Sequence, residues 1–222
     1  MSDWLSYTLS DFLLFSPRTY YRLFELYNSD IWPAQIAALM LGFAALGLWL
    51  RGGAWNGRAV AGILAACWLW VAGAYLLGRY DTINWAAKYF AAGFALEALL
   101  LVWAGVVRDR LALPPPAGMA GWGGLAIFAF ALCLQPLAAP LSGRPWSQVE
   151  LFGVAPDPTA VATLGILAAG RPPGWLIVLP AIWCAISAAT LWTMQSPDAL
   201  VTPATALLAL VLAACKFRRA TA

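Results

Sequence analysis

Long apolar stretches, separated by short polar or proline-rich connections, fill most of the chain. A helix that crosses a membrane needs about 20 predominantly apolar residues. Six stretches approach or exceed this length, and they cover residues 31–50, 59–77, 85–107, 121–141, 175–194 and 200–214. The pattern predicts an all-α fold, in which a polytopic bundle of transmembrane helices occupies residues 31–215.

A seventh apolar stretch, residues 159–170, has only 12 residues. As a helix it would be about 18 Å long at 1.5 Å per residue, which is short for a hydrocarbon core of about 30 Å. It either crosses as a short seventh span or enters and leaves as a re-entrant helix among six spans. A similarity between residues 33–47 and 156–170 favours seven spans, because it suggests two parallel repeats joined by the fourth span.

The distribution of Lys and Arg residues bears on orientation, since cytoplasmic loops of membrane proteins carry an excess of them. Seven spans with an outer N-terminus place eight basic residues inside and five outside, whereas six spans place nine inside and four outside. The basic residues therefore do not choose between the two topologies. Both topologies put the C-terminus and the short basic tail, residues 216–222, in the cytoplasm.

Residues 1–30 contain neither a predicted span nor the pattern of a signal peptide. Ser16 and Pro17 are typical of a helix N-cap followed by proline in the first turn. The apolar residues that follow recur at helical spacing, with charged residues between them: Tyr20, Leu23, Phe24 and Tyr27. We expect an amphipathic helix that lies on the membrane surface, or one that docks on loops of the protein itself.

The composition excludes a water-soluble globule. Hydrophobic residues make up 63% of the chain, charged residues 10%, and the mean hydropathy is +0.76, whereas soluble domains are about 45–50% apolar and about 25% charged. The excess apolar surface must face lipid, so a lipid bilayer is the first expected partner. The 13 basic residues are scattered over the ends of the spans, which excludes a contiguous nucleic-acid-binding patch.

The absence of histidine narrows the chemistry further. It removes imidazole ligation of haem, the usual zinc sites and nucleophiles activated by histidine. The four cysteines show no paired spacing and fall within or at the ends of predicted spans. We therefore expect no metal, no cofactor and no catalytic residues, and an enzyme is less expected than a non-catalytic protein.

Glu97 is the only charged residue deep inside a predicted span. A carboxylate near the centre of a bilayer costs several kcal/mol unless it is paired, protonated or hydrated. Lys88 cannot pair with it along the helix, because nine residues place the two side chains on opposite faces. Glu97 is therefore either a substrate or proton site, or a protonated group that forms a hydrogen bond between helices.

Other polar residues would lie in the outer half of a seven-span bundle. Pro156 and Pro158 bracket Asp157 and are expected to force it out of helical geometry just before a short apolar helix. The positive N-terminal end of that short helix would lie at membrane depth, where such helices mark binding sites in transporters, although Asp157 could also serve as a simple helix cap. With Glu97, the candidate binding residues are Gln35, Gln135, Asp157, Thr159, Trp183 and Ser187.

Four short motifs carry a family resemblance: LFELYN followed by IWPAQ, INWAA, FGVAPDPT and PAIW. With them the chain resembles an uncharacterised family of bacterial multi-pass membrane proteins, catalogued as a domain of unknown function, from about residue 20 to 200. The resemblance implies a bacterial inner membrane and no particular activity. In the family pattern cysteine is usual in place of Asp157 and glutamine is common in place of Glu97, so the resemblance implies no required carboxylate at either position.

Two functions follow as expectations. The first is a small-solute transporter or channel with a polar site around Glu97 near the middle of the membrane. The second is a non-catalytic accessory or assembly subunit of a membrane complex, with a second copy or another membrane protein as its partner. An intramembrane enzyme is less expected because no acid and base residues stand at a suggestive spacing.

Overall fold

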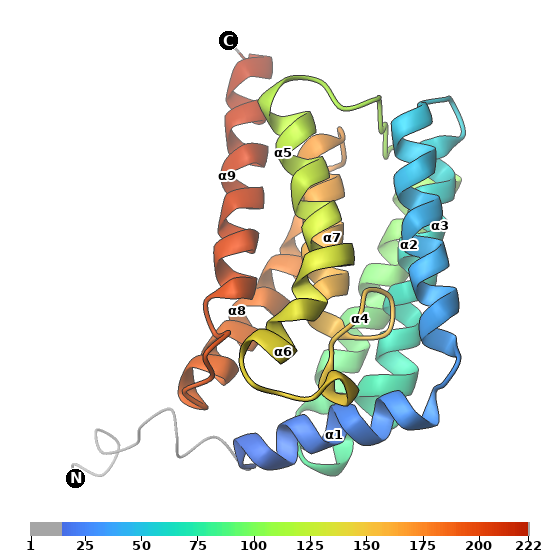
Figure 1. Ribbon diagram of the computed structural model, residues 1–222. Coiled ribbons are helices and arrows are strands. Elements are labelled where there is room, and N and C mark those ends of the chain that lie inside the picture. The colour runs from blue at the N-terminus through green and yellow to red at the C-terminus, as the bar shows by residue number, and fades with distance from the viewer. Residues whose placement is uncertain (1–14, 222) are drawn as a thin grey trace, which may run out of the picture.

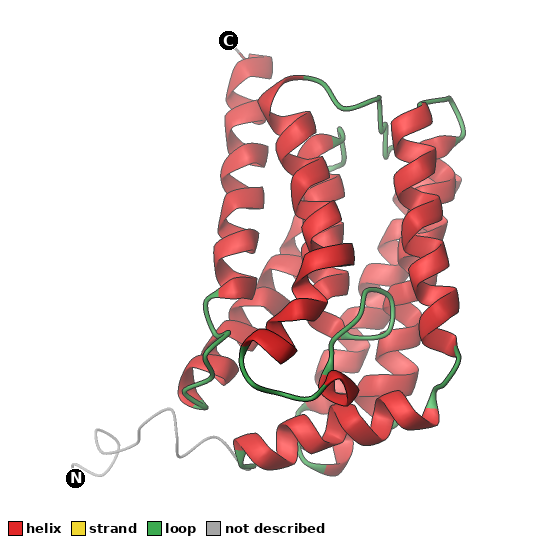
Figure 2. Cartoon of the chain, in the orientation of Figure 1, coloured by secondary structure: helices red, strands yellow, loops and turns green. Residues whose placement is uncertain are grey.

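The computed structural model describes residues 15–221, and it places side chains up to Lys216. Within this part the regular elements are helices, and one isolated β-bridge joins Ala112 to Arg171. The long helices lie side by side, and α1 lies across them at one end (Figure 1). Turns and short connections link them (Figure 2). Residues 1–14 of the predicted N-terminal segment lie outside the described residues.

The helix bounds lie close to the predicted spans. Several helices continue without a break into a π-helical segment, as α3 and α4 do at Val71–Leu77 and Val102–Val107. The long helices of the bundle are α2 (Ala34–Arg51), α3 (Asn56–Trp70), α4 (Ala87–Leu101), α5 (Gly118–Ala129), α7 (Pro156–Ala169), α8 (Val178–Thr193) and α9 (Val201–Thr221), and α6 (Ala138–Leu141) is a single turn.

Five of these helices, taken with their continuations, are long and apolar enough to cross a membrane. They cover Ala34–Arg51, Asn56–Thr82, Ala87–Val107, Gly118–Leu141 and Gly174–Thr193. The predicted span 200–214 falls in α9, whose apolar part, Val201–Lys216, is shorter. The predicted short segment 159–170 corresponds to α7. The fold is therefore that of a helical membrane protein with five span-length helices.

Helix α7 is the centre of the bundle, because all of its 14 residues are buried. It packs against α5, α8 and α9 and also reaches α3. The approach to α5 is closest at two glycines, where a methyl group on Gly124 would lie 2.3 Å from the carbonyl oxygen of Gly165. Glycine at both positions lets the two backbones meet. A helix of 14 residues is about 21 Å long, so α7 is enclosed by longer neighbours.

Helix α1 (Pro17–Asp30) begins at Ser16, whose hydroxyl accepts a hydrogen bond from the backbone N–H of Thr19. The four residues of its predicted apolar face are the ones that are buried. They pack on the protein itself. The ring of Phe24 stacks on Tyr75 at 5.0 Å, and the hydroxyl of Tyr27 donates a hydrogen bond to the carbonyl of Val154. Of the two expectations for α1, docking on the protein accounts for its apolar face.

Candidate functional site

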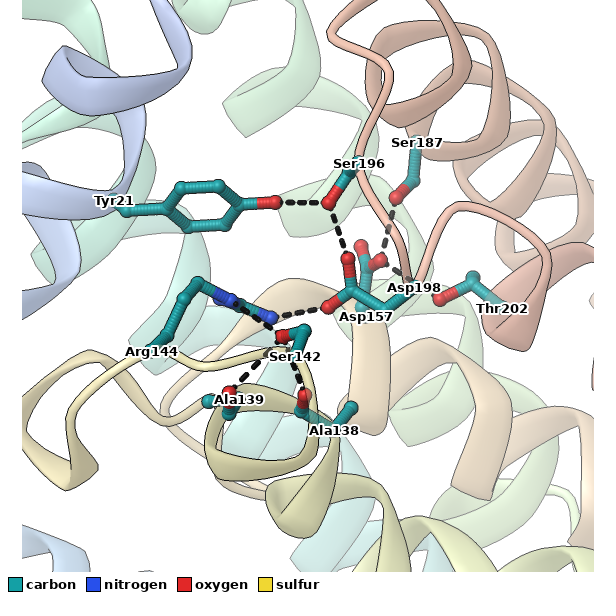
Figure 3. Close-up of polar contacts among 10 residues, drawn as sticks. All are labelled: Tyr21, Ala138, Ala139, Ser142, Arg144, Asp157, Ser187, Ser196, Asp198 and Thr202. Carbon is teal, nitrogen blue, oxygen red and sulfur yellow. Dashed lines mark hydrogen bonds and ion pairs between the residues drawn. The ribbon is translucent and has the colours of Figure 1, made fainter.

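The carboxylate of Asp157 is the best-connected polar group inside the bundle. Its Oδ1 accepts a hydrogen bond from the indole N–H of Trp183 at 2.8 Å. Its Oδ2 accepts two more, from the hydroxyls of Ser187 and Thr202, the latter at 2.9 Å. Only 2% of Asp157 is exposed. One side chain thus joins α7 to both α8 and α9 (Figure 3).

The local sequence explains why Asp157 stands there, and it corrects one expectation. The two prolines do not force Asp157 out of helical geometry, because α7 begins at Pro156. Proline is tolerated in the first turn of a helix, where its missing N–H has no helical partner. Asp157 is therefore the second residue of α7, where a carboxylate faces the positive end of the helix dipole.

A second group of charges lies beside Asp157, contributed by the loops that precede α7 and α9. Arg144 forms an ion pair with Asp198, and both side chains are 11% exposed. Asp198 also accepts a hydrogen bond from the hydroxyl of Ser196, which in turn is hydrogen-bonded to the hydroxyl of Tyr21 in α1 (Figure 3). Helix α1, the loop before α7 and the loop before α9 are therefore tied together at this point.

A small cavity of about 20 Å³ lies between these groups, with space for about one water molecule. Three atoms of its lining side chains are buried and have no hydrogen-bond partner within residues 15–216: Oε1 of Gln135, Nη1 of Arg144 and Oε2 of Glu150. The polar residues around it are Gln135, Arg144, Glu150, Asp157, Asp198 and Thr202. We call Glu150, Asp157 and Asp198, together with Arg144, the acidic cluster.

Burial raises the pKa of Glu150, in the loop before α7, well above its usual range. The negative charge of Asp157 adds to this increase, and the positive charge of Arg144 opposes it. Burial also raises the pKa of the Tyr21 hydroxyl in α1, to about 12, so Tyr21 stays protonated as a hydrogen-bonding group at neutral pH. Of these two groups, Glu150 is therefore the carboxyl that burial favours in its protonated form.

Four of the seven candidate residues meet at this place. Asp157, Trp183 and Ser187 are joined by hydrogen bonds, and Gln135 lines the adjacent cavity. Thr159 is close in sequence, but its hydroxyl is engaged by the backbone of the preceding loop, at Ala155 and Gly153.

Gln35 lies elsewhere and belongs to the contact between α2 and α1. Its side-chain N–H donates a hydrogen bond of 2.6 Å to the backbone carbonyl of Asn28. Its Oε1 is buried without a partner. Gln35 therefore holds the turn between the two helices and is not part of the acidic cluster.

Glu97, the residue on which the sequence expectation centres, is completely buried. Neither of its carboxyl oxygens has a hydrogen-bond partner among the described residues, and Glu97 does not line the cavity at the acidic cluster. An ionised carboxylate at that position would have no compensating group. The geometry therefore offers no support for Glu97 as a hydrated solute site.

A family model described as a family of unknown function (DUF6064) matches residues 18–222. The chain belongs to this family. The match runs from the second residue of α1 through α9. No curated protein and no solved structure matches the chain.

The site of this DUF6064 protein contains residues that sequence reasoning missed: Arg144, Glu150, Asp198 and Thr202. The predicted topology does contain an indication of them. In a topology with alternating spans, the loops before α7 and before α9 emerge at the same end of the bundle, so their charges can meet. Within the described residues, no group of three or more Cys, Asp or Glu side chains has an arrangement that could hold a metal ion.

Proposed function

We propose that the protein is a membrane transporter for a small polar solute, and that the acidic cluster is its proton-binding site. The observation that carries this proposal is the set of unpartnered polar atoms on Gln135, Arg144 and Glu150 around one cavity. A buried polar atom without a partner costs about 1–3 kcal/mol. Native proteins leave few such atoms, so three around one cavity favour an exchangeable occupant.

The charges favour a positively charged occupant. Three carboxyl groups face a single guanidinium, and the hydrogen-bonded carboxylate of Asp157 is held in place by three donors. The raised pKa of Glu150, caused mainly by burial, favours this carboxyl as the group of the cluster that binds a proton. A proton that binds at Glu150 reduces the net negative charge of the cluster and lowers the repulsion among its carboxylates.

The position of the acidic cluster also suits transport. Solute and coupling-ion sites of secondary transporters are often formed at the ends of short or broken helices inside a bundle. Helix α7 is short and fully enclosed, and Asp157 stands in its first turn. Because Asp157 of the cluster accepts hydrogen bonds from α8 and α9, a shift of either helix against α7 would change the geometry of the cluster.

For topology, we propose seven crossings, in which α7 and α9 join the five span-length helices. The end of the bundle opposite α1 carries most of the basic residues and one acidic residue, Asp109, among those described. The basic residues are Arg51, Arg58, Arg108, Arg110, Arg171 and Lys216. By the positive-inside rule this end faces the cytoplasm of a bacterial inner membrane, and the acidic cluster faces outward.

Proteoliposomes that contain a pH-sensitive dye test the proposal. We expect internal pH to change when pools of small amino acids, amines or sugars are added to vesicles with the wild-type protein. Asp157→Asn should lower this proton flux at least about tenfold. The neutral amide lacks the negative charge that helps the cluster to bind a proton. Asp109→Asn, at the opposite end, is the matched control and should keep the flux.

The same assay distinguishes between Asp157 and Glu97 as the residue that proton flux requires. Because Glu97 is sealed and outside the cavity, Glu97→Gln should retain the flux. A loss of flux in Glu97→Gln together with normal flux in Asp157→Asn would move the site back to the middle of the membrane. Wild-type vesicles that behave like protein-free vesicles with every solute pool would contradict transport.

A further inference from the structure

The upper ends of α5 and α9 in Figure 1 border a cavity of about 410 Å³, at the end of the bundle opposite α1. Its walls are the first turn of α5, the proline-rich segment that precedes it, and Leu212, Cys215 and Lys216 of α9. Most of the lining is apolar, and includes Pro115, Met119 and Leu212. Arg171 and Lys216 are the charged residues of the lining.

Among the described residues, these two cations have no carboxylate partner. Neither forms an ion pair with any carboxylate among the described residues. The ammonium of Lys216 donates hydrogen bonds to the carbonyls of Ala169 and Gly170, which fixes it at the C-terminal end of α7. The backbone N–H of Arg171 donates to the carbonyl of Ala112, which anchors the loop that carries it. Two residues in fixed positions thus bring positive charge, without a carboxylate partner among the described residues, to one cavity.

The cavity lies beside surface that is suited to lipid. Below it α5 and α9 touch, because a methyl group on Gly123 would lie 2.6 Å from Cδ1 of Leu212. Above this contact, the first turn of α5 and the C-terminal part of α9 line the cavity. Large apolar side chains on the two helices are exposed, among them Met119 and Trp122 on α5 and Leu208 and Val211 on α9. A positively charged cavity therefore adjoins an apolar outer face.

We propose that this cavity binds the phosphate headgroup of an anionic phospholipid, whose acyl chains lie along the outer faces of α5 and α9. An amphiphile matches both parts of the surface: the phosphodiester meets Arg171 and Lys216, and the chains cover exposed apolar side chains. Basic pockets between transmembrane helices on the cytoplasmic side are suited to such headgroups. This inference depends on the membrane location and is independent of the acidic cluster.

Native mass spectrometry of the full chain tests the inference. The protein is extracted from vesicles that contain equal amounts of phosphatidylglycerol and phosphatidylcholine, and the retained lipids are counted. We expect one phosphatidylglycerol to be retained in preference to phosphatidylcholine. Arg171→Gln should reduce this preference about fivefold, the effect of one basic residue near a membrane surface. Arg51→Gln, on the same end but outside the cavity, should leave it unchanged.

A second variant, Lys216→Gln, should lower the same preference for phosphatidylglycerol. Circular dichroism checks that α7 and α9 still form in this variant. If Lys216→Gln does not fold, the result for Arg171→Gln decides. Equal retention of phosphatidylglycerol by wild type, Arg171→Gln and Arg51→Gln would overturn the inference. Displacement of the lipid by glycerol phosphate would also overturn it, because the cavity would then be a site for soluble anions.

Discussion

The guanidinium of Arg144 lies 4.0 Å from the centre of the Tyr21 ring. This contact connects α1, which lies outside the bundle, to the acidic cluster inside it. The connection is reinforced by the hydrogen bond between the hydroxyls of Tyr21 and Ser196, since Ser196 also binds Asp198. Displacement of α1 would therefore disturb the ion pair between Arg144 and Asp198.

Replacing Tyr21 should loosen α1. Tyr21→Leu removes the cation–π contact and the hydrogen bond, a loss of roughly 2 kcal/mol, whereas Tyr21→Phe keeps the ring and should lose roughly 1 kcal/mol. Hydrogen–deuterium exchange of the α1 backbone measures the effect, and exchange should be fastest in Tyr21→Leu. Tyr89→Leu is the matched control, because Tyr89 is 71% exposed. Equal exchange in all three variants would show that Tyr21 does not hold α1.

The pKa of Glu150 predicts a pH dependence of stability. A raised pKa means that the folded state binds more protons than the unfolded state, in which glutamate titrates at about 4.3. The free energy of unfolding should therefore decrease as the pH rises above about 4.3, until Glu150 is ionised in the folded protein as well. The facing charges of Asp157, Asp198 and Arg144 shape this titration but do not change its sign.

Glu150→Gln should remove that part of the pH dependence, because the amide does not titrate. The apparent melting temperature in detergent, measured at a series of pH values, should have a shallower slope in Glu150→Gln and a higher value than wild type at neutral pH. Glu25→Gln is a control that should change the pH slope in the opposite direction, because a hydrogen bond from Arg22 lowers the pKa of Glu25. A slope in Glu150→Gln identical to that of the wild type would contradict the assignment.

Glu97 should be replaceable by an apolar residue of similar size. Its carboxyl oxygens are buried without partners, and removal of such a group can raise stability by about 1–3 kcal/mol. Glu97→Met should therefore increase the melting temperature in detergent. Leu96→Met, at an exposed position of the same helix, controls for the methionine itself. A marked decrease in Glu97→Met alone would indicate that Glu97 has a polar partner.

Much of the fold follows from the sequence, because length and hydropathy locate membrane helices well. The predicted segments overlap all seven long helices of the bundle, and the spacing of Tyr20, Leu23, Phe24 and Tyr27 identifies the buried face of α1. What the sequence could not predict is the rotation of each helix and the depth of α7. Residues 33–47 and 156–170 resemble each other in sequence, yet only five of the 18 residues of α2 are buried whereas every residue of α7 is buried.

The candidate site, like the fold, could be predicted from the sequence only in part. The proline-flanked Asp157 is conspicuous in the sequence, and Trp183 and Ser187 share a helical face that can meet it. Thr202, Arg144 and Asp198 join them only through tertiary packing of distant segments. Glu97 is equally conspicuous, but sequence shows only that it is intramembrane. Whether such a residue faces a cavity or a sealed contact depends on neighbouring helices that hydropathy does not resolve.

The contact between α5 and α7 gives the sharpest test of the packing. At Gly124 an added methyl group would lie 2.3 Å from the carbonyl oxygen of Gly165 and 2.7 Å from Cβ of Ala169. Gly124→Ala should therefore force α5 away from α7 and cost about 1–3 kcal/mol. Gly93→Ala is the matched control, since no atom lies within 4 Å of its added methyl, and alanine should stabilise α4 by up to about 1 kcal/mol. If melting in detergent responded equally to both substitutions, α5 and α7 would not be in backbone contact, and the enclosed position of α7 beside the acidic cluster would have to be abandoned.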